Sequence, residues 1–284
     1  AKLVIAEKIV HELANRLQTV LQADINALRL WFTERQYDAK SFASDLRIQA
    51  AIAELTALAR DSNTTALVLA NSAPAHTLRL HLQPLVEAQD YLSYVVVSPD
   101  KRILASTDPE VVGVRAPGSY DLFLNRALAG QLAASRPFAR QAALGRRVEG
   151  PTMFVAAPVK ATNGAVIAVL SLRMTPEKEF TSIFSVARIG ETGESYAFDR
   201  SALMLTATRS DPELKTLGLI PPGRENTAIL NLKLLDPEQE LRPGEPLAKP
   251  RNQLHLTRMA ASATMGNSDF DASGYRNYRG RKVV

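Results

Sequence analysis

Apolar residues recur at helical spacing through most of the first sixty positions. Residues 3–32 contain no Pro or Gly, and their apolar side chains repeat every three, four or seven positions, which predicts a long amphipathic helix. A second helical stretch covers 42–59 after a short polar link. Core packing and a dimer-forming stalk both remain open for the first helix. An uninterrupted coiled coil is disfavoured, because Asp24 falls on the line of apolar positions Leu3, Val10, Leu17 and Trp31.

The period changes after a further predicted helix over 74–91. Residues 93–97 are rich in β-formers, and a Pro-Asp turn at 98–101 joins them to a second short strand at 102–107. Two short strands around such a turn predict a hairpin.

The strongest strand signal lies further along the chain. A helix over 120–128 ends at Gly130, and strands at 152–160 and 165–174 are joined by Asn163-Gly164, a hairpin turn pair. Strand, turn and strand, then a helix, then a long hairpin indicate an antiparallel sheet with helices packed on it. The predicted fold class is α+β rather than a doubly wound parallel sheet.

The second half begins with a similar pattern. A short helix at 176–184 and a turn at 190–194 precede predicted strands at 195–199 and 203–208, which suggests a second copy of the first hairpin unit. We expect Asp199 to hold the turn after it through an Asx hydrogen bond. Residues 211–250 are rich in proline and predict a loop, and a helix is expected over 252–264.

Composition narrows the function classes. The 284 residues are 46% hydrophobic and 22% charged, values typical of a globular chain that folds on its own core. The absence of cysteine excludes thiolate catalysis, zinc ribbons and iron–sulfur clusters. We expect neither a metal nor a cofactor, since the four histidines are scattered without ligand spacing: His11, His76, His81 and His255.

Charge and motifs exclude further classes. The net charge of +5 is spread along the chain and aromatic residues make up 6%, so we expect no nucleic-acid partner. The sequence has no P-loop, no nucleophile elbow and no His-Glu-x-x-His, and the glycines at 113–118 and 190–193 are interpreted as turns. No catalytic residue is predicted. An apolar run of about 18 residues, which a membrane span would need, is missing, and both ends look cut, so we expect a fragment of a longer protein.

Three segments resemble a known family, the double Cache (PAS-like) extracytoplasmic sensor domains of bacterial transmembrane receptors such as sensor histidine kinases. The first segment pairs YVVVSPDKRILAST at 94–107 with TMFVAAPVKATNGAVIAVLSLRM at 152–174. The second is IGETGESYAFDRSALMLT at 189–206, and the third is GYRNYRGRKVV at 274–284, similar to the start of the closing hairpin of the family. With the long leading helix, the resemblance covers nearly the whole chain.

The resemblance implies a domain organisation and a location. It implies an N-terminal helical stalk at 1–58, a membrane-distal Cache subdomain at 59–175, and a membrane-proximal one at 176–284 whose last strands lie beyond Val284. Each subdomain would be an antiparallel sheet flanked by helices, on the periplasmic or extracellular side of an inner-membrane protein. Membrane spans would lie outside this chain. The basic tail of Arg276, Arg279, Arg281 and Lys282 would lie near the membrane, facing anionic headgroups or solvent.

The implied ligand site lies between the sheet of the distal subdomain and its covering helix. Strand alternation places Met153, Val155 and Ala157 on one face and Phe154 and Ala156 on the other, and the sequence leaves open which of these faces meets the ligand. Arg126 and Arg136 are candidates for binding a carboxylate, with a solvated surface position as the alternative for each. The tyrosine- and aspartate-rich motifs of the amino-acid-binding members of the family are not evident here, which favours small organic acids over amino acids. The predicted ligand-binding residues are Tyr94, Val96, Tyr120, Phe123, Arg126, Arg136, Phe138, Met153, Val155 and Ala157.

The leading hypothesis is therefore a non-enzymatic sensor that binds a small molecule and signals to a cytoplasmic output domain. That output would be a histidine kinase of a two-component system, a serine/threonine kinase, a nucleotide cyclase, a phosphatase or a chemoreceptor hub. A homodimer through the N-terminal helix is a further expected partner. The alternatives are a protein-binding or structural extracytoplasmic module without a small-molecule ligand, and a soluble α+β enzyme.

Overall fold

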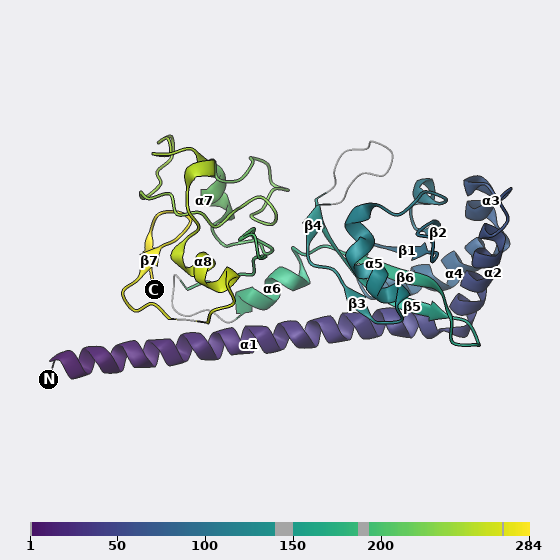
Figure 1. Ribbon diagram of the computed structural model, residues 1–284, viewed down its shortest axis with the longest axis horizontal. Coiled ribbons are helices and arrows are strands. Elements are labelled where there is room, and N and C mark those ends of the chain that lie inside the picture. Colours follow the sequence, from purple (N-terminus) through teal and green to yellow (C-terminus); the bar gives the residue numbers. More distant parts are fainter. Residues whose placement is uncertain (1, 140–149, 187–192, 269) are drawn as a thin grey trace. The chain divides into compact units, whose positions relative to one another are not determined.

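The computed structural model describes residues 2–139, 150–186, 193–268 and 270–284, with side chains from Lys8 onward except that of Val186. The chain divides into two compact units, one of residues 1–28 with 176–284 and the other of residues 29–175 (Figure 1). Residues 29–58, predicted as part of a stalk, belong to the second of these. The functional division at 1–58, 59–175 and 176–284 stays a prediction.

The chain begins with a helix that is longer than predicted. Helix α1 runs from Lys2 to Ser44 and α2 from Leu46 to Ala59, so the expected polar link between 32 and 42 is helical. No Gly or Pro interrupts that stretch. The helix ends at Asp45 because its carboxylate accepts hydrogen bonds from the backbone N–H groups of Arg47 and Ile48, at 2.9 and 3.2 Å, and so caps α2.

Residues 29–175 form one antiparallel sheet with helices on both faces. The strand order is β2-β1-β6-β5-β3, and β4 also pairs with β5. The strands are β1 (Ser93–Val97), β2 (Ile103–Ser106), β3 (Ala133–Ala134), β4 (Phe138–Ala139), β5 (Pro151–Lys160) and β6 (Val166–Met174). Both predicted hairpins are confirmed, and β5 and β6 are paired from Met153–Met174 to Lys160–Val166.

The two faces of this sheet carry different helices. Helix α5 (Asp121–Leu128) packs on one face, following the short 3-10 turns Pro109–Val111 and Gly118–Tyr120. Helix α2 packs on the other face together with α4 (Ala73–Ala88), and α3 (Ala66–Asn71) lies between them in sequence. The α+β class with a long N-terminal helix and an antiparallel sheet is confirmed.

The unit of residues 1–28 and 176–284 has less regular structure. Its helices are α6 (Glu179–Val186), α7 (Asp211–Thr216) and α8 (Arg258–Thr264), with a 3-10 turn at Arg251–Gln253. Its described ladder is the short pair β7 (Tyr275–Arg276) and β8 (Lys282–Val283). A buried apolar cluster holds it together, including Met204, Leu214, Leu232, Leu234 and Tyr278.

The predicted second hairpin forms only in part. The expected strands at 195–199 and 203–208 meet at a single antiparallel bridge, Phe198 to Met204, and α7 lies within the stretch predicted as loop. Asp199 explains the tight turn, since its Oδ1 accepts hydrogen bonds from the N–H groups of Ser201 and Leu203 at 2.8 and 3.0 Å, as expected. The predicted turn at 190–194 lies largely outside the described residues. The stretch 211–250, predicted as loop, also contributes isolated antiparallel bridges, Lys233 with Leu203 and Leu235 with Leu256.

Over the part of the chain that the structure describes, no helix combines the length and the apolar character needed to cross a bilayer.

Candidate functional site: the α5 face of the sheet and a charged pocket

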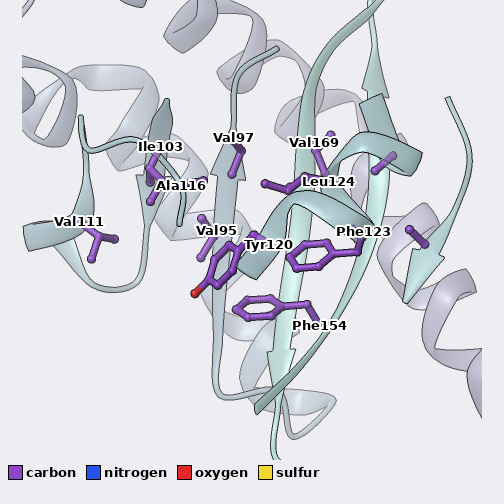
Figure 2. Packing of buried hydrophobic residues seen from close by; sticks show 13 residues of the cluster. Val95, Val97, Ile103, Val111, Ala116, Tyr120, Phe123, Leu124, Phe154 and Val169 are labelled. Carbon is purple, nitrogen blue, oxygen red and sulfur yellow. The ribbon is translucent and has the colours of Figure 1, made fainter. Parts of the chain in front are cut away.

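Four aromatic rings lie between α5 and the sheet. The ring centroid of Tyr120 is 4.9 Å from that of Phe154 and 5.7 Å from that of Phe138. Phe123 of α5 stacks on Phe154 of β5 with centroids 5.3 Å apart (Figure 2). Separations of this size are those of rings in direct contact, so the described side chains fill the space beneath α5.

Polar groups of β6 share that face. Successive strand residues alternate between faces, and Val95, Phe154, Ala156 and Val169 belong to the cluster under α5. Ser171 pairs with Val95 and with Ala156, so its side chain belongs to the same face. Arg173, two residues further on, pairs with Phe154. We call this surface of the sheet the α5 face.

The hydroxyl of Ser171 is an unusual feature of the α5 face. The residue is 1% exposed, and its Oγ has no hydrogen-bond partner among the described residues. A buried polar atom without a partner costs about 1–3 kcal/mol. Arg173 donates from its Nε to Thr152 Oγ1 at 3.0 Å, and Thr152 is also fully buried. The α5 face therefore combines aromatic rings with an unsatisfied hydroxyl and a half-buried guanidinium.

The structure separates the predicted ligand-binding residues into groups. Tyr120, Phe123 and Phe138 lie together beneath α5. The strand residues Tyr94, Val96, Met153, Val155 and Ala157 alternate with members of that cluster and therefore face α2 and α4. A single site cannot include both groups, because the sheet lies between them. Which group binds a ligand stays a prediction.

Tyr94 illustrates the second group. It is 1% exposed, and burial raises the pKa of its hydroxyl, while Arg79 of α4 acts in the opposite direction. All five residues of this group are buried in the layer between the sheet and the helices. They have the surroundings of ordinary core residues.

The two predicted arginines lie at the surface. Arg126 is in the last turn of α5, and Arg136 is in the segment between β3 and β4; both side chains are exposed. Arg126 is close in sequence to the buried Phe123, and Arg136 to the partly buried Phe138, both of the aromatic cluster. A ligand that reached them would contact the edge of the aromatic cluster.

Sequence reasoning missed Ser171 and Arg173. The sequence contained a signal for them. In the strand 169–173, Leu170 and Leu172 make one face purely apolar, whereas the other face carries the polar residues Ser171 and Arg173. In the structure this alternation places both polar residues on the side of α5.

A second feature was also missed, a pocket of about 760 Å³ in the unit of residues 1–28 and 176–284. It lies between the segment 236–240, the start of α8 and the β7–β8 hairpin. Its lining is charged on every side and consists of Asp236, Glu238, Gln239, Glu240, Arg258, Gly274, Tyr275, Arg276, Gly280, Arg281 and Lys282.

Two close backbone approaches fix the walls of this pocket. Gly280 has φ of +78°, and a Cβ there would lie 1.7 Å from the carbonyl oxygen of Gln239. The N–H of Leu241 also donates to the carbonyl oxygen of Arg279 at 3.0 Å. Only glycine fits at position 280, and the hairpin is thereby held against the segment 236–240.

Most charged groups of the lining are already paired. Asp236 accepts from Arg276 Nε at 3.0 Å, Glu238 pairs with Lys249 at 2.7 Å, and Arg258 pairs with Asp271 at 2.8 Å. Arg281 pairs with Glu213 at 2.6 Å and lies 3.6 Å from Glu240. Burial and the charge of Asp271 raise the pKa of Tyr275, so its phenol stays protonated. No group of residues suited to hold a metal ion occurs within the described ranges.

No protein-family model and no curated protein matches this sequence. Solved structures do match its fold. The sensor domain of the Vibrio cholerae histidine kinase DctB is 15% identical, with a TM-score of 0.47 over 86% of this chain and 90% of that one. The ligand-binding domain of the Pseudomonas aeruginosa chemoreceptor PctB, in complex with L-Arg, is 15% identical with a TM-score of 0.46 over 74% and 72%. The periplasmic domain of Vibrio cholerae LuxQ is 11% identical with a TM-score of 0.39 over 76% and 83%.

These neighbours are sensor or ligand-binding domains of histidine kinases and chemoreceptors, the class of protein that the sequence motifs resemble. They are not catalytic domains. At such identities and TM-scores they set no residue-by-residue correspondence with this chain.

Proposed function

We propose that this chain is the extracytoplasmic ligand-binding domain of a transmembrane receptor and binds a small organic anion on the α5 face. The observation that carries the proposal is the composition of that face. Ser171 Oγ is buried without a partner among the described residues, Arg173 lies two residues along the same strand face, and Phe154 of the aromatic cluster pairs with Arg173 on the neighbouring strand. A ligand carboxylate would accept from the Ser171 hydroxyl and from the guanidinium, while its apolar part would contact the rings.

Signalling would follow from a difference in affinity between two conformations. The four rings already contact one another, so a ligand that entered beneath α5 would have to move this helix or a ring. A ligand that binds the opened arrangement more tightly shifts the population toward it. That change would pass to membrane spans and to a cytoplasmic output domain outside this chain.

The ring packing also supports a second candidate function. A module that binds protein or serves a structural role needs no cavity under α5, and contacts between ring centroids of 4.9–5.7 Å are those of a filled core. The unsatisfied Ser171 hydroxyl favours the ligand-binding function, since a purely structural core would lose nothing with alanine at this position.

A homodimer through α1 stays a prediction. Apolar side chains are exposed on this helix at Ile9, Val10, Leu21, Leu30 and Tyr37. At about 100° per residue, Leu21 lies about 120° from Ile9 and about 180° from Leu30 around the helix, so the exposed residues form no continuous seam. Removing residues 1–30 should weaken self-association in sedimentation if the helix nevertheless forms the dimer contact.

The experiment for the proposed function begins with denaturation of the purified chain and mass spectrometry of any released compound. The compound found, or organic acids related to it, is then titrated calorimetrically into four variants: Ser171→Ala, Arg173→Gln, Arg126→Ala and Arg136→Ala. Arg47→Ala is the matched control, because Arg47 is an exposed helical arginine of the same unit, in the first turn of α2.

We expect Ser171→Ala and Arg173→Gln to weaken binding at least tenfold and the Arg47 control to bind as the wild type. Loss in Arg126→Ala or Arg136→Ala would extend the site to the edge of the aromatic cluster. Full binding by both Ser171→Ala and Arg173→Gln would contradict a site on the α5 face.

A further inference from the structure

The charged pocket of the second unit has one cation that its surroundings do not neutralise. Asp236, Glu238 and Glu240 each have a basic side chain within 3.6 Å, and Arg258 has Asp271. Lys282 has neither an ion pair nor a side-chain hydrogen bond within the described ranges, although it lines the pocket. The paired charges cancel, so the pocket presents the charge of Lys282.

A neighbouring group reinforces this positive end. In the β7–β8 hairpin, Lys282 pairs directly with Arg276. Like charges at directly opposite positions repel, and Asp236 offsets this repulsion only on the side of Arg276. Arg276 uses its Nε for Asp236, and no hydrogen bond or ion pair involves its two terminal nitrogens in the described part of the chain. Lys282 Nζ and these nitrogens are suited to bind one oxyanion.

The acidic part of the lining offers hydrogen-bond acceptors whose charges are balanced. An ionised carboxylate can accept about four hydrogen bonds, and the carboxylates of Glu238 and Glu240 use only some of this capacity. Their negative charges are balanced by Lys249 and Arg281, so they favour hydroxyl donors over an ammonium group. The amide of Gln239 and the phenol of Tyr275 add further polar groups.

The size of the pocket sets the scale of the ligand. Its volume of about 760 Å³ lies within the range of about 300–1,000 Å³ common for small-molecule sites and far exceeds the volume of a single phosphate or carboxylate ion. The ligand must therefore carry more than its anionic group.

We propose that this pocket binds a small polyhydroxylated anion, a sugar acid or a sugar phosphate, with its oxyanion between Lys282 and Arg276 and its hydroxyls on Glu238 and Glu240. This site is separate from the α5 face, so it stands or falls independently of the proposed function.

The test is calorimetric titration of the chain with D-gluconate and with glucose 6-phosphate. Sorbitol, which keeps the hydroxyls but has no oxyanion, and hexanoate, which keeps the carboxylate but has no hydroxyls, are the paired controls. Lys282→Gln removes the unpaired charge from an exposed side chain. Lys233→Gln is its matched control, an exposed lysine of the same unit outside the pocket lining.

We expect gluconate or glucose 6-phosphate to bind at least tenfold more tightly than sorbitol and hexanoate, and Lys282→Gln to lose at least tenfold in affinity while Lys233→Gln loses none. An unchanged thermal midpoint in Lys282→Gln shows that the fold is kept. The proposal is overturned if neither sugar anion binds the folded chain, if sorbitol binds equally well, or if Lys282→Gln binds as the wild type.

One further arm separates a free solute from a lipid headgroup with the same chemistry. Phosphatidylglycerol vesicles carry a phosphate next to glycerol hydroxyls, and phosphatidylcholine vesicles serve as the control. If the chain cosediments with phosphatidylglycerol vesicles but binds neither gluconate nor glucose 6-phosphate, these residues contact the membrane surface, and the pocket proposal is overturned.

Discussion

The two units reach a stable fold by different means. In residues 29–175, long strands with alternating or continuous apolar residues form a sheet whose two faces are both covered by helices. In the unit of residues 1–28 and 176–284, isolated bridges, short helices and side-chain caps such as Asp199 replace a large sheet. The first unit has an apolar interior beneath α5, whereas the second has an open pocket lined by charges. Both units bury an apolar cluster, but the described charged pocket is formed where irregular segments of the second unit meet.

The largest expected effect tests the apolar side of this comparison. Phe123→Ala removes a ring that is 2% exposed and contacts three other rings, so it should lower the free energy of unfolding by about 3–5 kcal/mol. Leu122→Ala, the adjacent but exposed position of α5, should change it by less than about 0.5 kcal/mol. Urea denaturation measures both, and equal losses would show that α5 is not packed as described.

The second prediction tests how tightly the charged pocket is built. Gly280→Ala would place a methyl group against the carbonyl of Gln239 at a positive φ, and we expect a loss of about 2–3 kcal/mol. Gly244→Ala is the control, since its φ is also positive, +79°, but no atom lies within 4 Å of the added carbon. That variant should lose only about 1 kcal/mol. Similar losses in the two variants, measured by thermal unfolding, would mean that the hairpin does not contact the segment 236–240.

A smaller, pH-dependent effect is expected at Asp211. Burial raises the pKa of this carboxyl, although the N–H groups of Thr208 and Ala228 donate to it and lower the pKa in part. Since the folded chain holds the proton more tightly than the unfolded chain, stability falls as the pH rises from 3.8, the usual value, through the raised pKa. Asp211→Asn keeps an acceptor for both N–H groups and should remove this fall. Urea midpoints at pH 3.5 and pH 7 measure it, and an unchanged pH dependence in the variant would contradict the assignment.

The smallest expected effect concerns the unsatisfied hydroxyl of the α5 face. Ser171→Ala should leave the free energy of unfolding unchanged or raise it by up to about 1 kcal/mol, because a buried atom without a partner is removed. Thermal unfolding without ligand measures this change. A clear loss of stability would show that Ser171 has a structural partner, and the argument for a ligand there would fail.

The difference between the units also explains what the sequence could predict. The β5–β6 hairpin was predictable because Asn163-Gly164 specifies its turn and the flanking residues specify its strands. The pairing within 195–208 was not predictable. It depends on the hydrogen bonds of Asp199 and on contacts with residues distant in sequence, such as the bridge between Leu203 and Lys233.

The candidate sites differ in the same way. Tyr120, Phe123 and Phe138 could be identified as neighbours, but alternation alone did not show which strand face meets α5, so Tyr94 and Met153 were grouped with them. The charged pocket could not be found from the sequence, since Asp236 and Arg276 meet only through the tertiary fold.

The most direct test of the central claim, that the α5 face binds a small organic anion, is a thermal-shift screen of the chain against organic acids and amino acids. A compound at about 100 times its dissociation constant adds about 2.7 kcal/mol to the stability of the folded state, which gives a clear rise in the unfolding midpoint. The account predicts such a rise with an organic acid, and its loss in Ser171→Ala or Arg173→Gln. No shift across the panel, or a shift that both variants keep in full, would contradict it.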